Sequence, residues 1–392
     1  MVDTQPYPPL LSIPNQQGPW PSGAQRIMYR TTDAHGRATA ASGTYFDASL
    51  PWIGAGPRPL VVLGPGTQGQ GDQCAPSRLF QDGVHYNAPL DFAVEYEVLQ
   101  VHALLSRGID VVVTDYQGLG TAGMHSYVDR RAQGHAMLDG RSGREGVARQ
   151  PDRRRQPDRV SGATRRAAGA ASAAEMQPSY APDLDVRGTY AGGPPADLRA
   201  VAAALDGGLA TGLLGYAVNS IYAGYPETRA DIDGALAPAG RQALDEIAAQ
   251  CVPETIARYG LHAPPSGRRT DARSPNSSTR CVGERGGRRA AHRTVDAREP
   301  GADRAGAQRR PDSAQPGHST GRRLVRSGAT VEFRTEEIPP IAPGFVVGHG
   351  LPMVSGLPSA LGLDDRPIRR GAGAIGLLEL TVRRGRTHRP GG

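Results

Sequence analysis

Apolar residues follow two periodicities along the chain, and the elements that they predict alternate. The run RPLVVLGPG at 58–66 is typical of a short buried strand followed by a loop. Residues 95–120 begin at helical spacing, stop at an Arg-Gly pair and continue into the strand-like IDVVVTDY. Residues 186–208 repeat a strand, a glycine- and proline-rich loop and a helix with an aspartate cap, and 328–340 contain a late strand. This alternation predicts an α/β fold with a mostly parallel sheet.

Three stretches lack periodicity, at 140–169, 264–327 and 364–392. The first two consist almost wholly of Arg, Gly, Ala, Pro, Ser and Asp, a composition typical of disordered basic linkers. The 392-residue chain has a net charge of +7, and its arginines crowd into these two stretches. We expect all three to be irregular or disordered.

Charge alone says little about partners. The arginine-rich stretches have no aromatic residue to stack on bases and no recognised nucleic-acid-binding module, so they support only salt-sensitive, non-specific contact. No apolar run approaches the roughly 20 residues of a membrane-spanning helix. The N-terminal MVDTQPYPPLLSIPN lacks the basic start and apolar core of a signal peptide, so we expect none in this chain. Gly118-Leu119-Gly120 is too short for a nucleotide loop, and we expect neither metal nor cofactor.

The readable segments resemble the secretory lipase family, which is the lipase A type of α/β-hydrolase. GTQGQGDQCAPS is long and unusual, and it makes the resemblance specific. The matching segments are QRIMYRTTDAHGRATAASGTYF (25–46), GPGTQGQGDQCAPS (64–77), GIDVVVTDYQGLG (108–120), YVDRRAQGHAMLD (127–139), PSYAPDLDVRGTYAGGPPADL (178–198) and GHGLPM (348–353).

The resemblance implies an α/β-hydrolase core with a helical cap insertion. Core segments are expected at 25–139, 170–199 and 328–363, and the cap at 200–262, where plain core helices are the alternative. Residues 1–24 then form an N-terminal extension. The implied protein is a secreted lipase or carboxylesterase that hydrolyses lipid esters through a Ser-His-Asp triad, at or near a lipid–water interface, without a cofactor.

The family's motifs assign roles to four residues of this sequence. His349 takes the position of the general base, and a loop histidine that stabilises a turn is the alternative. Gln68 takes the oxyanion-donor position, with a glycine-rich turn of no chemical role as the alternative. Cys74 and Cys251 match cysteines that pair, which implies an oxidising compartment, and a free buried Cys74 is the alternative.

Two parts of the triad are missing from the chain as written. No G-x-S-x-G elbow lies between Asp139 and Pro178. If the codons for Gly162 to Gly169 are read in a frame that begins at the third base of the first codon, they can spell Gly-Tyr-Ser-Gln-Gly-Gly-Gly. The serine codon in that frame consists of the last base of the Thr164 codon and the first two bases of the Arg165 codon. The elbow is therefore encoded one frame away.

The acid loop behaves in the same way. Gln308 to Pro311, read from the second base, can spell Asn-Asp-Asp, which places the acid at Arg309. In that frame Arg323 to Arg326 can spell Asp-Trp-Cys, and Leu361 to Ile368 can spell Gly-Trp-Met-Thr-Asp-Arg-Phe. Shifted GC-rich codons also yield Arg, Ala, Gly and Pro in bulk. We therefore expect frameshifted coding and a catalytically inactive chain. A non-catalytic α/β-hydrolase-like protein and a basic nucleic-acid-binding protein are the alternatives.

Overall fold

The computed structural model describes seven stretches of the chain: residues 5–6, 24–54, 56–142, 159–164, 168–260, 330–336 and 377–383. We describe only the backbone of residues 5–6, 159–164, 168, 330–336 and 377–383. Among the helices of these stretches, none is long and apolar enough to cross a membrane.

The strands and helices alternate along much of the chain. The strands are β1 (Gln5–Pro6), β2 (Ala24–Thr32), β3 (Ala38–Phe46), β4 (Pro59–Leu63), β5 (Val84–Asn87), β6 (Asp91–Val94), β7 (Asp110–Gln117), β8 (Arg159–Thr164), β9 (Asp185–Gly192), β10 (Thr330–Glu336) and β11 (Leu377–Arg383). The helices are η1 (Asp72–Cys74), α1 (Pro76–Asp82), α2 (Val98–Leu105), α3 (Arg130–Asp139), α5 (Ala168–Tyr180), α6 (Leu198–Leu205), α7 (Leu213–Gly224), η2 (Pro226–Thr228), α8 (Arg229–Ala235), α9 (Pro238–Ile247) and α10 (Val252–Tyr259).

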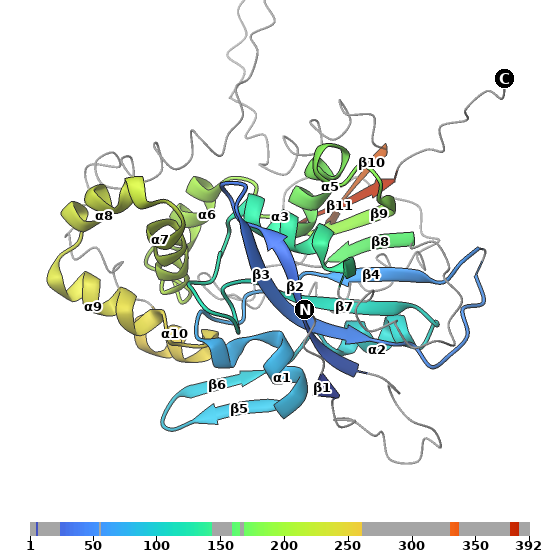
Figure 1. Cartoon of the computed structure of the whole chain (residues 1–392). Coiled ribbons are helices and arrows are strands. Elements are labelled where there is room, and N and C mark those ends of the chain that lie inside the picture. The colour runs from blue at the N-terminus through green and yellow to red at the C-terminus, as the bar shows by residue number, and fades with distance from the viewer. Residues whose placement is uncertain are drawn as a thin grey trace, which may run out of the picture.

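Nine of the described strands form one sheet, in the order β1-β2-β3-β7-β4-β8-β9-β11-β10 (Figure 1). β4 is parallel to β7 and β8, and β8 is parallel to β9. The outer pairings are antiparallel. The sheet is therefore mixed, and the predicted parallel pairing holds only for its four central strands. Antiparallel strands need only a short connection, such as the turn between Asp33 and Arg37 that joins β2 to β3.

The two faces of the sheet bury separate apolar clusters, because side chains alternate along each strand. From β4, Leu60 and Val62 join the cluster that α3 and α5 cover. Val61 and Leu63 join the opposite cluster, which includes Phe80 of α1 and the buried residues of α2. β4 and β7 are thus buried on both faces, which explains why PLVVL and the VVV of β7 read as unbroken apolar runs.

Two segments expected to be irregular contain strands. β8 lies within 140–169 and pairs with both β4 and β9, and β11 lies within 364–392 and pairs with β9 and β10. In β8, pairing on both sides supplies a ladder of backbone hydrogen bonds that outweighs the weak strand propensity of RVSGAT. In β11, the sequence LLELTVR itself favours a strand, and the composition of the whole segment hides this local signal. The segment 264–327 lies outside the described residues.

The helices α6 to α10 gather at one side of the sheet in Figure 1. Asp197 begins α6 as predicted, because its carboxylate accepts hydrogen bonds from the backbone N–H groups of Arg199 and Ala200. A disulfide joins Cys74 to Cys251, the residue that precedes α10, and both cysteines are fully buried. It links the loop after β4 to this helical region.

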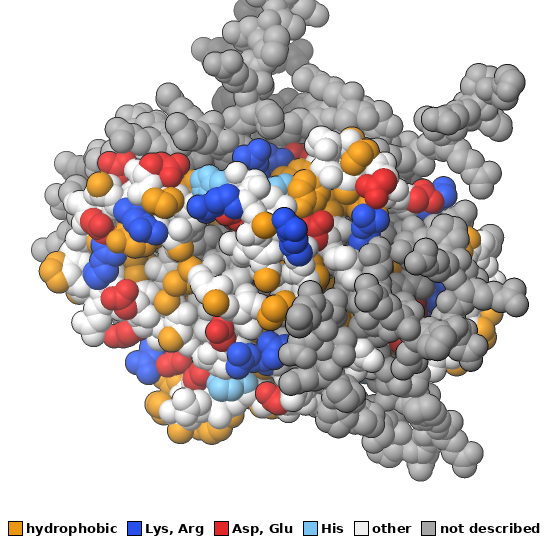
Figure 2. All heavy atoms as spheres, viewed as in Figure 1, with side chains coloured by type: hydrophobic (Ala, Val, Ile, Leu, Met, Phe, Trp, Pro, Cys, Tyr) orange, Lys and Arg blue, Asp and Glu red, His pale blue; other side chains and the backbone are white. Residues whose placement is uncertain are grey.

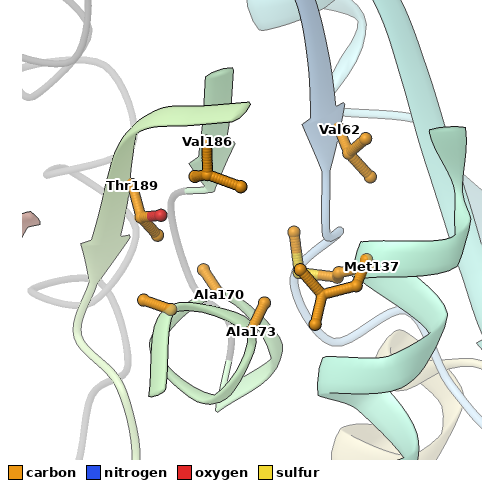
Figure 3. Close-up of a pocket in the computed structure, with 8 residues that line it drawn as sticks. Val62, Met137, Ala170, Ala173, Val186 and Thr189 are labelled. Atoms are coloured by element: carbon orange, nitrogen blue, oxygen red, sulfur yellow. The ribbon is translucent and has the colours of Figure 1, made fainter. Parts of the chain in front are cut away.

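A small cavity lies between the sheet and the helices α3 and α5 (Figure 3). Its volume is about 20 Å³, which is room for roughly one water molecule. The lining is almost wholly apolar: Val62, Met137, Leu138, Ala170, Ala173, Ala174, Val186 and Thr189. Ligand pockets are about 300 Å³ or larger, so this cavity is a packing gap left by the alanines of α5 and not a substrate site.

Candidate active site

The order of the central strands places a site at the carboxyl ends of β4 and β8. From β4 the chain crosses to β7 on one side, and from β8 it crosses to β9 on the other. Connections that leave neighbouring parallel strands in opposite directions open a crevice at the carboxyl ends of those strands, where open α/β sheets bind ligands. The two segments that border this crevice are the loop 64–71 and the junction between β8 and α5.

The junction between β8 and α5 is short in sequence. β8 ends at Thr164 and α5 begins at Ala168, so only three residues separate them. This is the topology of a nucleophile elbow. The residues between are Arg165, Arg166 and Ala167, which lie outside the described residues.

The loop 64–71 is held by hydrogen bonds from four different segments. The Gly66 N–H donates to Glu97 Oε1 at 3.0 Å, and the Tyr96 hydroxyl donates to the Thr67 carbonyl at 3.1 Å. The Val252 N–H donates to the Gln68 carbonyl at 2.9 Å. Further bonds reach the loop from Tyr127, Tyr216 and Asn219. A loop fixed on so many sides is preorganised, as an oxyanion-binding loop has to be.

The side chain of Gln68 is buried, with 5% of its surface exposed. Its Nε2 has no hydrogen-bond partner among the described residues. Leaving a buried donor unpaired costs about 1–3 kcal/mol, and such groups in folded proteins are often functional. Gln68 is therefore a donor that remains available at the crevice.

Two glutamates are buried beside this loop. Glu97 accepts from Gly66 through Oε1 and from the Gln100 side chain through Oε2. Burial raises the pKa of Glu95 well above its usual range, and the neighbouring Glu97 raises it further. Glu95 is thus held in its neutral form while its Oε1 accepts from the Glu97 N–H.

Tyr116 lies between the two sides of the crevice. Its backbone has φ of 65°, a left-handed conformation that is rare outside glycine. A Cβ atom on Gly64, just after β4, would lie 2.0 Å from the Tyr116 hydroxyl, and one on Gly169 of α5 would lie 2.8 Å from it. The hydroxyl is buried without a hydrogen-bond partner among the described residues. Both glycines therefore leave room for Tyr116.

His125 stacks on the Tyr116 ring, with ring centroids 6.2 Å apart. Its Nδ1 lies 3.4 Å from the carbonyl oxygen of Gln117. Burial lowers the pKa of His125 to about 4, so its imidazole is neutral at physiological pH. A neutral imidazole with so low a pKa is a weak proton acceptor at neutral pH.

Comparisons with known proteins show which family this chain resembles. A family model described as secretory lipase matches residues 85–276. The chain is 30% identical over 241 residues to a secreted triacylglycerol lipase of Malassezia restricta, covering 60% of this chain and 48% of the relative. It is 26% identical over 240 residues to the protein named "Probable inactive lipase" of Mycobacterium tuberculosis, covering 61% of this chain and 52% of that protein. The resemblance to secretory lipases is confirmed.

Solved structures confirm the α/β-hydrolase fold. Candida antarctica lipase A in its closed state has a TM-score of 0.51 and 21% identity, covering 67% of this chain and 58% of that one. A hydrolase from Legionella pneumophila has a TM-score of 0.50 and 20% identity, with coverages of 67% and 66%. The chain spans about half the length of the curated lipases that it matches.

Only some of the residues assigned roles from the sequence lie among the described residues. Gln68 lies in the loop after β4, and the disulfide joins Cys74 of η1 to Cys251, the residue before α10. His349 and Arg309 lie outside the described residues, as does Arg165. The structure therefore does not test the predicted base or the two lost triad positions.

The sequence did not reveal the groups that surround the loop 64–71. Glu95 and Glu97 were assigned to a helix that in fact begins at Val98. The spacing Glu-x-Glu before an apolar helix was the available signal. Tyr116 and His125 carried no signal, because their roles come from a left-handed backbone and from burial.

Close packing of Gly64 against Tyr116 generates a prediction about stability. Gly64→Ala is expected to lower the free energy of unfolding by about 1–3 kcal/mol, because the new methyl group overlaps the Tyr116 hydroxyl. Adding Tyr116→Phe removes the overlapping oxygen and should recover at least about 0.5 kcal/mol of that loss. Urea denaturation of the two single variants and the double variant measures the coupling.

Gly234→Ala is the matched control, since no atom lies within 4 Å of the position its Cβ would take inside α8. It should leave stability unchanged or raise it slightly. Strictly additive effects of Gly64→Ala and Tyr116→Phe would contradict the predicted overlap.

Burial of neutral His125 generates a prediction about pH. Unfolded chains take up a proton on this histidine below about pH 6.5, whereas the folded chain stays neutral down to about pH 4. Stability should therefore fall by up to about 3 kcal/mol from this residue as the pH drops through that window. His125→Phe removes the titrating group and keeps the aromatic contact with Tyr116.

The measurement is the difference in unfolding free energy between parent and His125→Phe at several pH values between 4 and 7. Glu95 acts in the opposite direction, because its raised pKa stabilises the fold on acidification, and it contributes equally to both chains. A difference that does not change with pH would show that His125 is not buried in its neutral form.

Proposed function

We propose that this chain descends from a secretory lipase that hydrolysed lipid esters, and that the chain as written has lost ester hydrolysis. The observation that carries the proposal is the junction after β8. It borders the crevice beside the preorganised loop 64–71, and its sequence, Thr164-Arg165-Arg166-Ala167, contains no serine. Without the nucleophile, a triad loses most of its catalytic gain, because its members act as a unit.

The proposal extends to the origin of the loss. Frameshifted coding accounts for a missing elbow at 163–167 and a missing acid near Arg309, both in text rich in arginine. Codons that specify these residues can spell the elbow motif and the acid motif in a shifted frame. The relative of Mycobacterium tuberculosis, which carries the name "Probable inactive lipase", supports the proposal of an inactive chain.

Lipid esters are the proposed ancestral substrate, and a lipid–water interface the proposed site of action. The hairpin β5–β6 supports the second point, because its outer face carries Val84, Tyr86, Phe92 and Val94, all at least 41% exposed. Apolar side chains also gather along the lower edge of the molecule in Figure 2, where the hairpin lies. Clustered exposed apolar groups mark interaction surfaces. We further propose that helices α6 to α10 formed the cap over the acyl site and that the parent protein was secreted.

Two alternative functions receive different support. A folded but non-catalytic α/β-hydrolase-like protein is favoured by the complete sheet centre, in which β8 pairs on both sides. Nucleic-acid binding has less support, because the arginine-rich stretches contain no aromatic residue on which bases could stack.

Purified chain is expected to show no turnover of a p-nitrophenyl ester above background. A cooperative thermal transition serves as the control that the domain is folded, and it separates loss of the nucleophile from loss of the fold. A variant with a rebuilt elbow combines five substitutions: Ala163→Gly, Thr164→Tyr, Arg165→Ser, Arg166→Gln and Ala167→Gly. This variant should react with a phosphonate ester that labels activated serines. Turnover by the unaltered chain that His349→Ala abolishes would refute the proposal.

The coding sequence provides an independent test. The third bases of the codons for Ala163, Thr164 and Arg165 must be T, T and C to permit Tyr-Ser-Gln, and those near Arg309 must permit Asn-Asp-Asp. Any other base at the codon for Thr164 removes the serine from the shifted frame. In that case the frameshift explanation is wrong, although the prediction of inactivity stands.

A further inference from the structure

A group of potential metal ligands lies behind the loop 64–71. His85 Nε2, a carboxylate oxygen of Asp91 and Cys251 Sγ all lie within 4.8 Å of one another. Cys74 Sγ is bonded to Cys251 Sγ, so a second sulfur lies at the same place. The residues come from the hairpin β5–β6, from η1 and from the position before α10. The family resemblance pairs the two cysteines, but only the folded chain brings His85 and Asp91 to them.

The carboxylate of Asp91 has unused capacity to bind. Its Oδ2 accepts from His85 Nε2 at 2.7 Å and from Gln73 Nε2 at 3.2 Å. Its Oδ1 is buried and has no hydrogen-bond partner among the described residues. An unpaired carboxylate oxygen costs free energy in a protein interior, and a cation would relieve that cost.

The surroundings suit a metal centre. Both cysteines are fully buried and pack with Leu79 and Ala93 in one apolar cluster. His85 pairs with Ala93 across the hairpin, so it lies on the inner face of that hairpin, and its side chain is 25% exposed. An apolar shell with one accessible ligand restricts water while leaving a path for the ion.

We propose that reduction of the disulfide between Cys74 and Cys251 creates a zinc site formed by His85 Nε2, the Asp91 carboxylate and the two cysteine sulfurs. One imidazole nitrogen, one carboxylate oxygen and two thiolates form a donor set that Zn²⁺ binds tetrahedrally. While the disulfide is intact, its sulfurs are poor ligands, and only His85 and Asp91 remain. The oxidation state of the cysteines therefore decides whether the site exists.

The chemistry balances with a dithiol as reductant. The dithiol transfers two electrons and two protons to the sulfur–sulfur bond, which becomes two thiols, and the reductant becomes a cyclic disulfide. Zn²⁺ then displaces the two thiol protons to solvent. At His85 the metal would bind Nε2 in place of the hydrogen bond between Nε2 and Asp91. The single proton of the neutral ring would then lie on Nδ1.

Zinc would then take over the cross-link that the disulfide now supplies. The Gln68 carbonyl accepts from the Val252 N–H, and Gly69 forms a β-bridge with Cys251, so the loop 64–71 rests directly on this centre. Either cross-link holds that loop against α10. The proposal does not depend on ester hydrolysis and stands whether or not the chain is catalytic.

Co²⁺ binding to the full chain tests the proposal, because a thiolate bound to cobalt gives a charge-transfer absorption that other ligands do not. Chain reduced with a dithiol, then freed of it by anaerobic gel filtration, should bind one Co²⁺ with this band and exchange it for Zn²⁺. Oxidised chain should show no band. His85→Ala and Asp91→Asn should each weaken binding at least tenfold, whereas His102→Ala, in α2, should not.

Cys74→Ser keeps the test valid if reduction unfolds the parent. This variant leaves Cys251 as a free thiol beside His85 and Asp91 without any reductant, and it should also give the cobalt band. The proposal is wrong if neither reduced parent nor Cys74→Ser shows the band. Equal affinity of the parent and His85→Ala would overturn it as well.

Discussion

Backbone pairing in the middle of the sheet is the constraint on which the rest of the structure depends. β4 is buried on both faces and has a parallel neighbour on each side, so its N–H and C=O groups are satisfied only while β7 and β8 are present. β8 in turn supplies the partner that β9 requires. This demand explains why a segment of poor strand composition, Arg159 to Thr164, lies at the centre of the sheet.

The strand order decides where a site lies in this protein, whereas the residues at that place decide its chemistry. The crossing of connections at β4 and β8 places a crevice at their carboxyl ends whatever residues lie there. The loop 64–71 keeps its hydrogen bonds and the buried amide of Gln68. The residues at the end of β8 and after it, Thr164 to Ala167, include no serine, which is the basis of the proposal that the chain is inactive.

The disulfide has two roles in this arrangement. It ties the loop after β4 to α10, and it sequesters two sulfurs that lie beside His85 and Asp91. The same buried position that stabilises the loop therefore assembles a potential zinc centre. The Tyr116 side chain lies against Gly64 and Gly169. Because these two residues have no Cβ atom, there is room for its ring and hydroxyl.

The sequence by itself determined the strands with apolar runs, the helix cap at Asp197 and the likeness to secretory lipases, because these depend on local periodicity and on contiguous motifs. Tertiary structure alone decided that β8 is a strand, since its pairing partners lie far away along the chain. It also decided the burial of Glu95 and His125, the unpaired amide of Gln68 and the grouping of His85, Asp91 and Cys251. Burial and proximity between distant segments arise only when the chain folds, and no local pattern encodes them.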